Sequence, residues 1–340
     1  MTVSVKRHPL SEISGIGPAS LIKLEAIGIT TVEAFAYATR RELEEASIKE
    51  SARKLQEQAF KLIGAKLFVT AEELRETQKD VKKLSTGVTA LDKIFQGGYE
   101  TRSLTELVGE FGTGKSQLAY TASVMVQLPE SEGGLDGAAL LIDTEETFRV
   151  ERIEQIAKAR GVDPDLAVKR VIVAPAFNSD HQELILSKAD DIIQEANVRL
   201  IIIDSLIAHF RSEYLGRGEL AERQQEINRH LHHIARLARG FNAVALITNQ
   251  AVATPDNVYS HVQWKPAGGN IMAHAPQLRV ALRKVRDPMR IGRIIDSSFL
   301  PTAEALFNLS DHGVSDITEE QTKTRRRPGG ESETPTPEAA

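Results

Sequence analysis

The stretch from Gly109 to Ser116 constrains the chain more than any other, because its sequence GEFGTGKS has the form G-x-x-x-x-G-K-[S/T]. Residues 103–108 before it are predicted to form a strand and residues 117–126 after it a helix, the context that a phosphate-binding loop requires. Glycines let successive N–H groups converge on one anion, and the following helix adds the positive end of its dipole. Lys115 would then reach the β- and γ-phosphates of a nucleotide, and the Ser116 hydroxyl would bind Mg²⁺. A glycine-rich turn with a chance lysine is the alternative. The expected nucleotide-binding residues are Gly109, Glu110, Phe111, Gly112, Thr113, Gly114, Lys115 and Ser116.

Composition sets the class of protein around this loop. At 340 residues the chain is long enough for about two domains, and it has no cysteine, which excludes disulfides, thiolate chemistry and cysteine-based zinc sites. Its 42 basic and 47 acidic residues give a net charge of −5, so any surface that binds a polyanion must be local. The polar N-terminus does not resemble a signal peptide, and no apolar run approaches the ~18 residues of a membrane span. We therefore expect a cytoplasmic protein without a membrane partner.

Residues 1–64 are predicted to form a small all-α domain, because apolar residues recur there at helical spacing. The turn Ile13-Ser14-Gly15-Ile16-Gly17 resembles a helix–hairpin–helix motif. In such a turn Gly15 and Gly17 would expose backbone N–H groups that hold a DNA phosphate, and Lys23 on the next helix would add charge. An ordinary pair of packed helices is the alternative, since short motifs also occur by chance.

Residues 65–83 are an expected linker between this domain and the rest of the chain. The segment from Leu67 to Thr70 is short, apolar and β-prone, and the helical domain offers it no partner strand. Such a segment can add itself to the sheet edge of a neighbouring molecule. A local core contact by Phe68 is the alternative.

From residue 84 to 317, strand and helix patterns alternate, which predicts an α/β core with a mostly parallel sheet and helices on both faces. The expected strands are 138–143, 170–174, 199–204 and 243–249, and the expected helices are 150–159, 179–196 and 219–239. Three shorter segments, 278–286, 290–296 and 304–308, are predicted as antiparallel strands that close one edge. The polar tail, residues 318–340, is expected to be disordered.

Polar side chains stand at the ends of three predicted strands. Asp204 ends an apolar run, where an acid beside a phosphate loop would hold the Mg²⁺ shell. Glu145 is the candidate to orient the attacking water, with Glu146 as its competitor. We expect the amide of Gln250 to sense the γ-phosphate. The expected catalytic residues are therefore Lys115, Glu145 and Gln250, and ordinary turn or loop positions are the alternative for Asp204 and Gln250.

Two glycine-bearing loops follow these strands and look suited to a polyanion. The basic and flexible residues of the two loops are Arg211, Arg217 and Arg223 in and after the first, and Gly268 and Gly269 in the second, which spans residues 251–274. Six basic residues and one acid then occupy residues 279–293. Together they predict a nucleic-acid groove, with basic groups along the backbone and flexible loops near the bases. A solvated basic face is the alternative.

These features together resemble the archaeal RadA recombinases, a family of the RecA/Rad recombinase superfamily, over residues 10–316. The resemblance is carried by GEFGTGKS at 109–116, IDTE at 142–145, FRSEY at 210–214, GRGELAERQ at 216–224, TNQ at 248–250 and GGNI at 268–271. It implies a RecA-like P-loop ATPase core behind a helix–hairpin–helix N-terminal domain. The chain departs from the family pattern at Val150, Pro175 and Ser298, positions that bear on the local backbone and on the subunit contact.

For the nucleotide, the resemblance implies that ATP binds with Mg²⁺ at the boundary between protomers. Glu145 would position the attacking water, and Gln250 and His274 would report the γ-phosphate. Arg152 would pack on the adenine. Residues from Asp296 to Pro301 would cap the ATP of the neighbouring protomer.

For DNA and assembly, the resemblance implies a first DNA loop that includes Arg217 and Arg223, and a second formed by residues 251–269. Phe68 and Ala71 match the F-x-x-A oligomerisation motif of the family. Their docking site on the next subunit would lie near Ala174 and Ala176. The N-terminal domain would help gather double-stranded DNA.

The expected function is that of a DNA-dependent ATPase and homologous recombinase. It would form a filament on single-stranded DNA, pair it with a homologous duplex and exchange strands in recombination and repair, in association with the nucleoid and possible mediator proteins. Two other functions fit the same core. One is a mediator that regulates a recombinase and hydrolyses little ATP, and the other is a ring-forming helicase.

Overall fold

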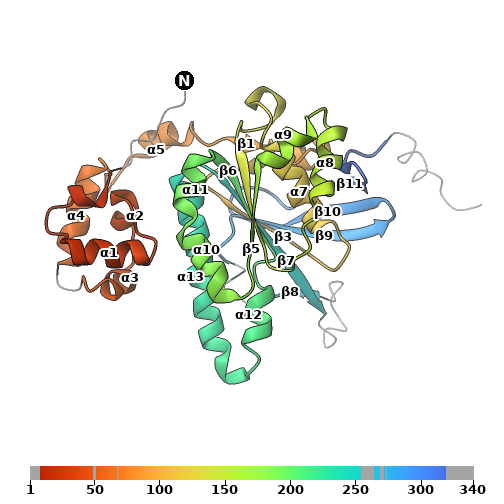
Figure 1. Ribbon diagram of the computed structural model, residues 1–340. Coiled ribbons are helices and arrows are strands. Elements are labelled where there is room, and N and C mark those ends of the chain that lie inside the picture. The colour runs from red at the N-terminus through yellow and green to blue at the C-terminus, as the bar shows by residue number, and fades with distance from the viewer. Residues whose placement is uncertain are drawn as a thin grey trace, which may run out of the picture.

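The computed structural model describes residues 8–48, 51–66, 68–253, 264–268, 272 and 274–318. A small helical unit lies beside a larger α/β core, and the segment that contains α5 connects the two (Figure 1). The elements of the helical unit are η1 (Leu10–Glu12), α1 (Pro18–Ala26), α2 (Val32–Ala36), α3 (Arg40–Glu45) and α4 (Ala52–Leu62). They enclose a separate apolar cluster that includes Leu24, Phe35 and Leu43.

Local sequence explains where these short helices begin. Pro18 occupies the first position of α1, where its missing N–H costs nothing. The Thr31 hydroxyl caps α2 by accepting a hydrogen bond from the Ala34 N–H at 3.1 Å. Thr39 and Glu42 form a capping box at the start of α3, in which each side chain bonds the other residue's N–H.

The core is built on one large sheet with the strand order β12-β11-β10-β9-β3-β7-β6-β4-β5. Its strands are β3 (Leu104–Gly109), β4 (Ala138–Asp143), β5 (Val171–Pro175), β6 (Val198–Asp204), β7 (Val244–Ala253), β9 (Leu278–Arg286), β10 (Met289–Ser297), β11 (Glu304–Ser310) and β12 (Gly313–Ser315). The six strands from β9 to β5 run parallel, and β10, β11 and β12 continue antiparallel. The predicted parallel sheet with an antiparallel edge is confirmed.

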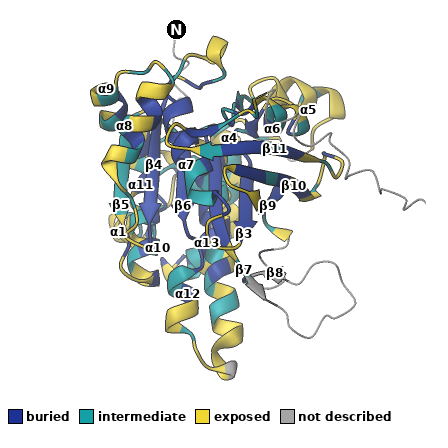
Figure 2. Cartoon of the chain, turned by 90° about the vertical axis from the view of Figure 1, so that its right-hand side faces the viewer, coloured by how far each residue is buried: buried dark blue, intermediate teal, exposed yellow. Residues whose placement is uncertain are grey.

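Helices cover both faces of this sheet. The helices of the core and linker are α5 (Ala71–Gln78), α6 (Thr89–Ile94), α7 (Lys115–Met125), η2 (Glu130–Glu132), α8 (Val150–Ala159), α9 (Pro164–Lys169), α10 (Ser179–Ser187), α11 (Ala189–Glu195), α12 (Ala208–Glu213), η3 (Arg217–Glu219) and α13 (Leu220–Gly240). Successive residues of β6 point to opposite faces of the sheet, because side chains alternate along a strand. Ile202 packs in the cluster that includes residues of α7 and α8, whereas Ile201 and Ile203 pack in the cluster of α10, α11 and α13. The central strands are therefore buried from both sides (Figure 2).

Smaller strands lie beside this framework. β1 (Lys83–Leu84) pairs with β2 (Tyr99–Glu100), and β8 (Trp264–Pro266) pairs antiparallel with the end of β7. The β7–β8 hairpin therefore leaves the sheet at its carboxyl edge. No helix of the described residues is long and apolar enough to cross a membrane.

One local prediction was wrong. The helix expected over 179–196 is divided into α10 and α11 at Lys188, whose backbone (φ −105°, ψ 1°) is not helical. The break adjoins Ser187, which Gly28 of the helical unit approaches so closely that a Cβ there would lie 3.2 Å from the Ser187 backbone. Residues 68–70 pair with no strand of the described residues, and Thr70 and Glu73 form a capping box that starts α5. Pairing of this segment with a neighbouring molecule stays a prediction.

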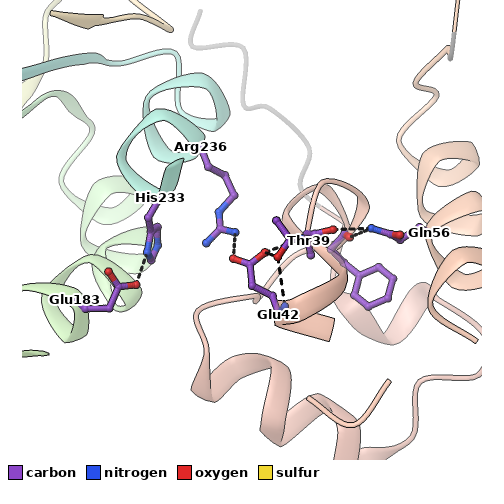
Figure 3. Close-up of polar contacts among 8 residues, drawn as sticks. Thr39, Glu42, Gln56, Glu183, His233 and Arg236 are labelled. Carbon is purple, nitrogen blue, oxygen red and sulfur yellow. Dashed lines mark hydrogen bonds and ion pairs between the residues drawn. The ribbon is translucent and has the colours of Figure 1, made fainter. Parts of the chain in front are cut away.

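The helical unit contacts the core through polar side chains. Arg236 on α13 donates from Nη1 to Glu42 Oε1 at 3.2 Å (Figure 3). The Thr30 hydroxyl donates to Asp190 Oδ2 on α11 at 3.3 Å. This contact therefore depends on charge and hydrogen bonding in addition to packing.

Candidate nucleotide and nucleic-acid site

The loop between β3 and α7 has the backbone that a phosphate cradle needs. Gly112 (φ 74°) and Gly114 (φ 99°) both adopt left-handed conformations, and Gly114 is the N-cap of α7. A side chain at Gly109 would lie 2.6 Å from the Leu282 carbonyl oxygen, so only glycine fits there. The Thr113 hydroxyl closes the loop by donating to the Glu110 carbonyl at 2.8 Å. The loop thus places its N–H groups at the positive end of α7.

Lys115 folds back across this loop. Its Nζ donates to the Gly109 and Glu110 carbonyl oxygens, both at 2.9 Å. Burial lowers the pKa of Lys115, and the charges of Asp204 and Glu145 offset part of that fall. The ammonium group therefore lies within the loop and close to two acids.

Asp204 ends β6 beside the loop. Its Oδ1 accepts a hydrogen bond from the Thr248 hydroxyl at 2.5 Å, while its buried Oδ2 has no hydrogen-bond partner within the described residues. Burial raises the pKa of the Asp204 carboxyl, and the hydroxyls of Thr248 and Ser116 partly oppose that rise. A carboxylate oxygen and a nearby hydroxyl are the oxygen ligands that Mg²⁺ prefers, so Asp204 and Ser116 fit such an ion.

Asp143 organises the loop that follows β4. Its carboxylate accepts hydrogen bonds from the N–H groups of Glu145 at 3.2 Å and Phe148 at 2.9 Å. This arrangement turns Glu145 towards the phosphate loop and β6. Ser205, held to Thr144 by a 2.9 Å bond from its own N–H, donates from its hydroxyl to Glu145 Oε1 at 2.9 Å.

Glu145 also accepts a hydrogen bond from Gln250. The Gln250 amide nitrogen donates to Glu145 Oε1 at 3.0 Å, and Gln250 lies opposite Gly109 in the register of β7 with β3. Two predicted catalytic side chains are thus in direct contact beside the phosphate loop. Glu146 is exposed with a left-handed backbone (φ 54°), and its side chain takes no part in this contact.

An arginine-lined pocket opens at the same end of the sheet. It has a volume of about 190 Å³ and is lined by Ile207, Arg211, Arg223, Ile227, Ala267 and Gly268. The buried Nε of Arg223 has no hydrogen-bond partner in the part of the chain that the structure describes. Gln224 Nε2 donates to the Gly268 carbonyl at 3.1 Å, which joins α13 to the end of the β7–β8 hairpin. The pocket therefore offers one buried, unpaired cationic donor, Arg223 Nε, to an anion.

The remaining nucleotide candidates are spread around this centre. Arg152 on α8 donates to Gln117 Oε1 at 2.6 Å and to the carbonyls of Ser310 and Asp311, each at 2.5 Å, so it anchors the β11–β12 turn. His274 is exposed. Asp296 lies on β10 at a bulge opposite Arg279, and exposed Pro301 follows that strand. The structure does not bring these residues into contact with Glu145.

The remaining DNA candidates fall in three places. Gly15 (φ 106°) and Gly17 lie in the turn before α1, and neither N–H donates a hydrogen bond within the described residues. Arg217 lies in η3, with its side chain outside the described structure, and Gly269 is likewise outside the described residues. Most of the predicted second DNA loop, residues 254–263, also lies outside them.

The candidates for assembly are separated in this chain. Phe68 is 90% exposed, and Ala71 is the first residue of α5. Ala174 lies on β5, the strand at one edge of the sheet, and Ala176 just after it is buried. Among the described residues, Phe68 is thus an exposed apolar side chain and β5 is a strand edge without a partner strand.

Sequence reasoning missed a buried polar cluster beneath the phosphate loop. Glu106 Oε2 accepts from Arg279 Nε at 2.5 Å, and its Oε1 accepts from Asn249 Nδ2 at 2.6 Å. All three residues are buried. The signal was present, because Glu106 is the one charged residue in the run from Leu104 to Gly109.

Comparison with known proteins gives two findings. A family model described as Rad51 matches residues 77–317. The chain is also similar to the DNA repair and recombination protein RadA of Aeropyrum pernix, with 42% identity over 309 residues, which cover 90% of this chain and 96% of that protein.

Proposed function

The chain belongs to the Rad51 family, and on that premise we propose that it is a DNA-dependent ATPase and homologous recombinase. It forms a filament on single-stranded DNA, pairs this strand with a homologous duplex and exchanges strands. The observation that carries the proposal is that Lys115, Asp204 and Glu145 surround one phosphate loop, while an arginine-lined pocket opens at the same end of the sheet. No observation on the described residues favours the mediator or the helicase.

ATP is the nucleotide, held by residues 109–116. The N–H groups of the loop and the start of α7 bind the phosphates. Lys115, which now donates to two loop carbonyls, exchanges these bonds for phosphate oxygens. Mg²⁺ would be held by Ser116 and Asp204 and would neutralise charge on the β- and γ-phosphates.

Glu145 orients the water that attacks the γ-phosphate. Its carboxylate lies near Lys115 and is positioned by Ser205. Gln250 contacts Glu145 directly and senses the γ-phosphate with its amide. We also assign His274 to the γ-phosphate and Arg152 to the adenine, by resemblance to the family.

DNA occupies the pocket formed by α12, α13 and the β7–β8 hairpin. Arg211 and Arg223 bind the phosphate backbone, and Gly268 at the hairpin end lets that backbone approach closely. Arg217 and Gly269 extend this surface by resemblance to the family. Gly15 and Gly17 of the helical unit, whose N–H groups donate no hydrogen bond within the described residues, bind duplex DNA.

Assembly brings Phe68 and Ala71 of one protomer against Ala174 and Ala176 of the next. The exposure of Phe68 and the position of β5 at the sheet edge support this contact. Residues from Asp296 to Pro301 then cap the neighbour's ATP. We further propose that the protein works with recombination mediators on nucleoid DNA.

Lys115→Ala tests the ATPase. We expect it to lower kcat for ATP hydrolysis by about 100-fold or more, because it removes the charge that stabilises the transferred phosphate. Lys158→Ala, an exposed lysine on α8, is the matched control and should hydrolyse ATP at the wild-type rate.

A strand-exchange assay with ATP and homologous duplex tests the whole function. Absence of any stimulation of the wild-type ATPase by single-stranded DNA at low salt would refute it.

A further inference from the structure

Arg211, Gln250 and Glu145 form one continuous chain of hydrogen bonds. Arg211 Nη1 on α12 donates to Gln250 Oε1 at 3.1 Å, and Gln250 Nε2 donates onward to Glu145 Oε1 at 3.0 Å. The same oxygen of Glu145 accepts from Ser205 at 2.9 Å. The chain starts at a side chain of the arginine-lined pocket and ends at the carboxylate beside the phosphate loop.

These hydrogen bonds engage the two polar groups that hydrolysis needs, the Gln250 amide and the Glu145 carboxylate. Gln250 has one amide, and both of its ends are engaged, with its oxygen on Arg211 and its nitrogen on Glu145. While these bonds persist, the amide cannot turn to the γ-phosphate, and Glu145 Oε1 accepts from two protein donors in place of a water. The side chains of Arg211, Gln250 and Glu145 are all exposed, so each of these hydrogen bonds is weak and readily exchanged.

We propose that Arg211, Gln250 and Glu145 are a latch that restrains ATP hydrolysis until DNA enters the pocket. This inference rests on the proposed function. Arg211 is the positioning residue, since it acts on Glu145 only through Gln250. A DNA phosphate is a stronger partner for the guanidinium than a neutral amide oxygen, because a charge-assisted, bidentate bond replaces a single one. When the phosphate takes Arg211, the Gln250 amide is released, and Glu145 becomes available to the attacking water.

The position of Gln250 explains how one side chain contacts both the phosphate-loop site and the arginine-lined pocket. Gln250 pairs in register with Gly109, the first residue of the phosphate loop. Its carbonyl accepts from the Ala267 N–H at 3.0 Å, just beyond β8. It therefore lies where β7 leaves the central sheet and enters the hairpin that flanks the pocket.

Arg211→Ala tests the latch without DNA. We expect the variant to hydrolyse ATP with a DNA-free kcat about threefold above wild type, the size of effect expected from loss of one exposed, charge-assisted hydrogen bond. The KM for ATP should be unchanged, because Arg211 does not touch the phosphate loop. The ratio of DNA-saturated to DNA-free kcat should fall by the same factor. A DNA-free kcat equal to or below that of wild type overturns the latch.

Two further variants separate the latch from simple DNA contact. Arg223→Ala removes the other pocket arginine, which has no bond to Gln250, and should weaken DNA affinity while saturating DNA still gives full stimulation. Arg229→Ala removes an arginine of α13 that pairs with Glu226 at 3.2 Å, and its DNA-free kcat should equal that of wild type. If DNA fails to stimulate wild type, the proposed function falls. If wild type is stimulated and Arg211→Ala has a wild-type DNA-free kcat, only the latch falls.

Discussion

Glu106 places a charge in the buried middle of β3, three residues before the phosphate loop. Its two oxygens accept from Arg279 on β9 and Asn249 on β7, and Asn249 Nδ2 also donates to the Ala267 carbonyl at 2.8 Å. Burial raises the pKa of the Glu106 carboxyl, and Arg279 and Asn249 offset part of that rise. One cluster therefore ties three strands of the sheet to the end of the β7–β8 hairpin.

Arg279→Met is expected to destabilise the protein by about 3–5 kcal/mol, because it leaves the Glu106 carboxylate buried without its counter-charge. Urea unfolding of the full chain, monitored by circular dichroism, measures the decrease in the free energy of unfolding. The double variant Glu106→Leu/Arg279→Met removes both charges and should recover most of it, since an apolar pair needs no compensation. A single variant as stable as wild type would show that the ion pair does not matter to the fold.

Residue types were predictable at this scale, but their partners were not. Lys115, Asp204 and Glu145 could be chosen as candidates because a motif or a strand end marks each of them. The bond between Gln250 and Glu145 joins residues 105 positions apart and depends on the register of the sheet. The bond from Arg211 to Gln250 depends in addition on how α12 leaves β6, which no periodicity reports.

At the scale of elements, the segment before α5 presents an exposed apolar side chain, Phe68. Phe68 is 90% exposed, and the capping box of Thr70 and Glu73 fixes the start of the helix immediately after it. An exposed apolar side chain directly before a fixed helix start fits the docking contact proposed above.

Phe68→Glu is expected to convert the assembled protein to monomers without affecting the fold. A carboxylate that must enter an apolar docking site costs several kcal/mol, whereas an exposed one costs almost nothing. Size-exclusion chromatography with light scattering measures the mass, and thermal unfolding reports the fold. Leu74→Glu, an exposed apolar residue on α5, is the matched control and should assemble as wild type does. Wild-type filaments formed by Phe68→Glu would rule out this docking contact.

The order of elements was predictable where the sequence pattern is strong. The apolar runs that became β4, β6 and β7 and the amphipathic stretches of α8 and α13 were found because strands and helices have different periods. The break between α10 and α11 was not found, because it adjoins Gly28, about 160 residues earlier in the chain. Contacts between distant segments leave no local signal.

At the scale of the whole molecule, the helical unit is held against the core by a contact centred on Glu42. This carboxylate caps α3 through Thr39 and also accepts from Arg236 on α13 (Figure 3). Burial raises the pKa of Glu42, but the hydrogen bonds from Thr39 and the charge and hydrogen bond of Arg236 outweigh it and lower the pKa below its usual value. One turn earlier on α13, His233 bonds Glu183 of α10 at 3.0 Å, which fixes α13 on the core side.

The share of the Glu42 pKa lowering that comes from Arg236 gives this contact its pH dependence, whereas the share from Thr39 stays with the helical unit when it undocks. A carboxyl whose pKa is lowered by docking stabilises the docked state above its unperturbed pKa, and that contribution is lost as the pH falls through the lowered value. We therefore expect the helical unit to stay docked at neutral pH and to loosen in acid below about pH 4. High salt should have the same effect, because the Glu42–Arg236 pair is partly exposed and so is screened.

Arg236→Glu is expected to undock the helical unit at neutral pH, because it places two carboxylates side by side. Small-angle X-ray scattering on a monomeric Phe68→Glu background should then show a larger radius of gyration. Glu42→Gln is the sharper control, since glutamine at this position still caps α3 but carries no charge. It should loosen docking by about three- to fivefold in population, the effect of one partly exposed ion pair, while α3 remains folded. If Arg236→Glu scatters as wild type does, the docked position depends on apolar packing and the backbone approach of Gly28 to Ser187, and the charge pair is incidental.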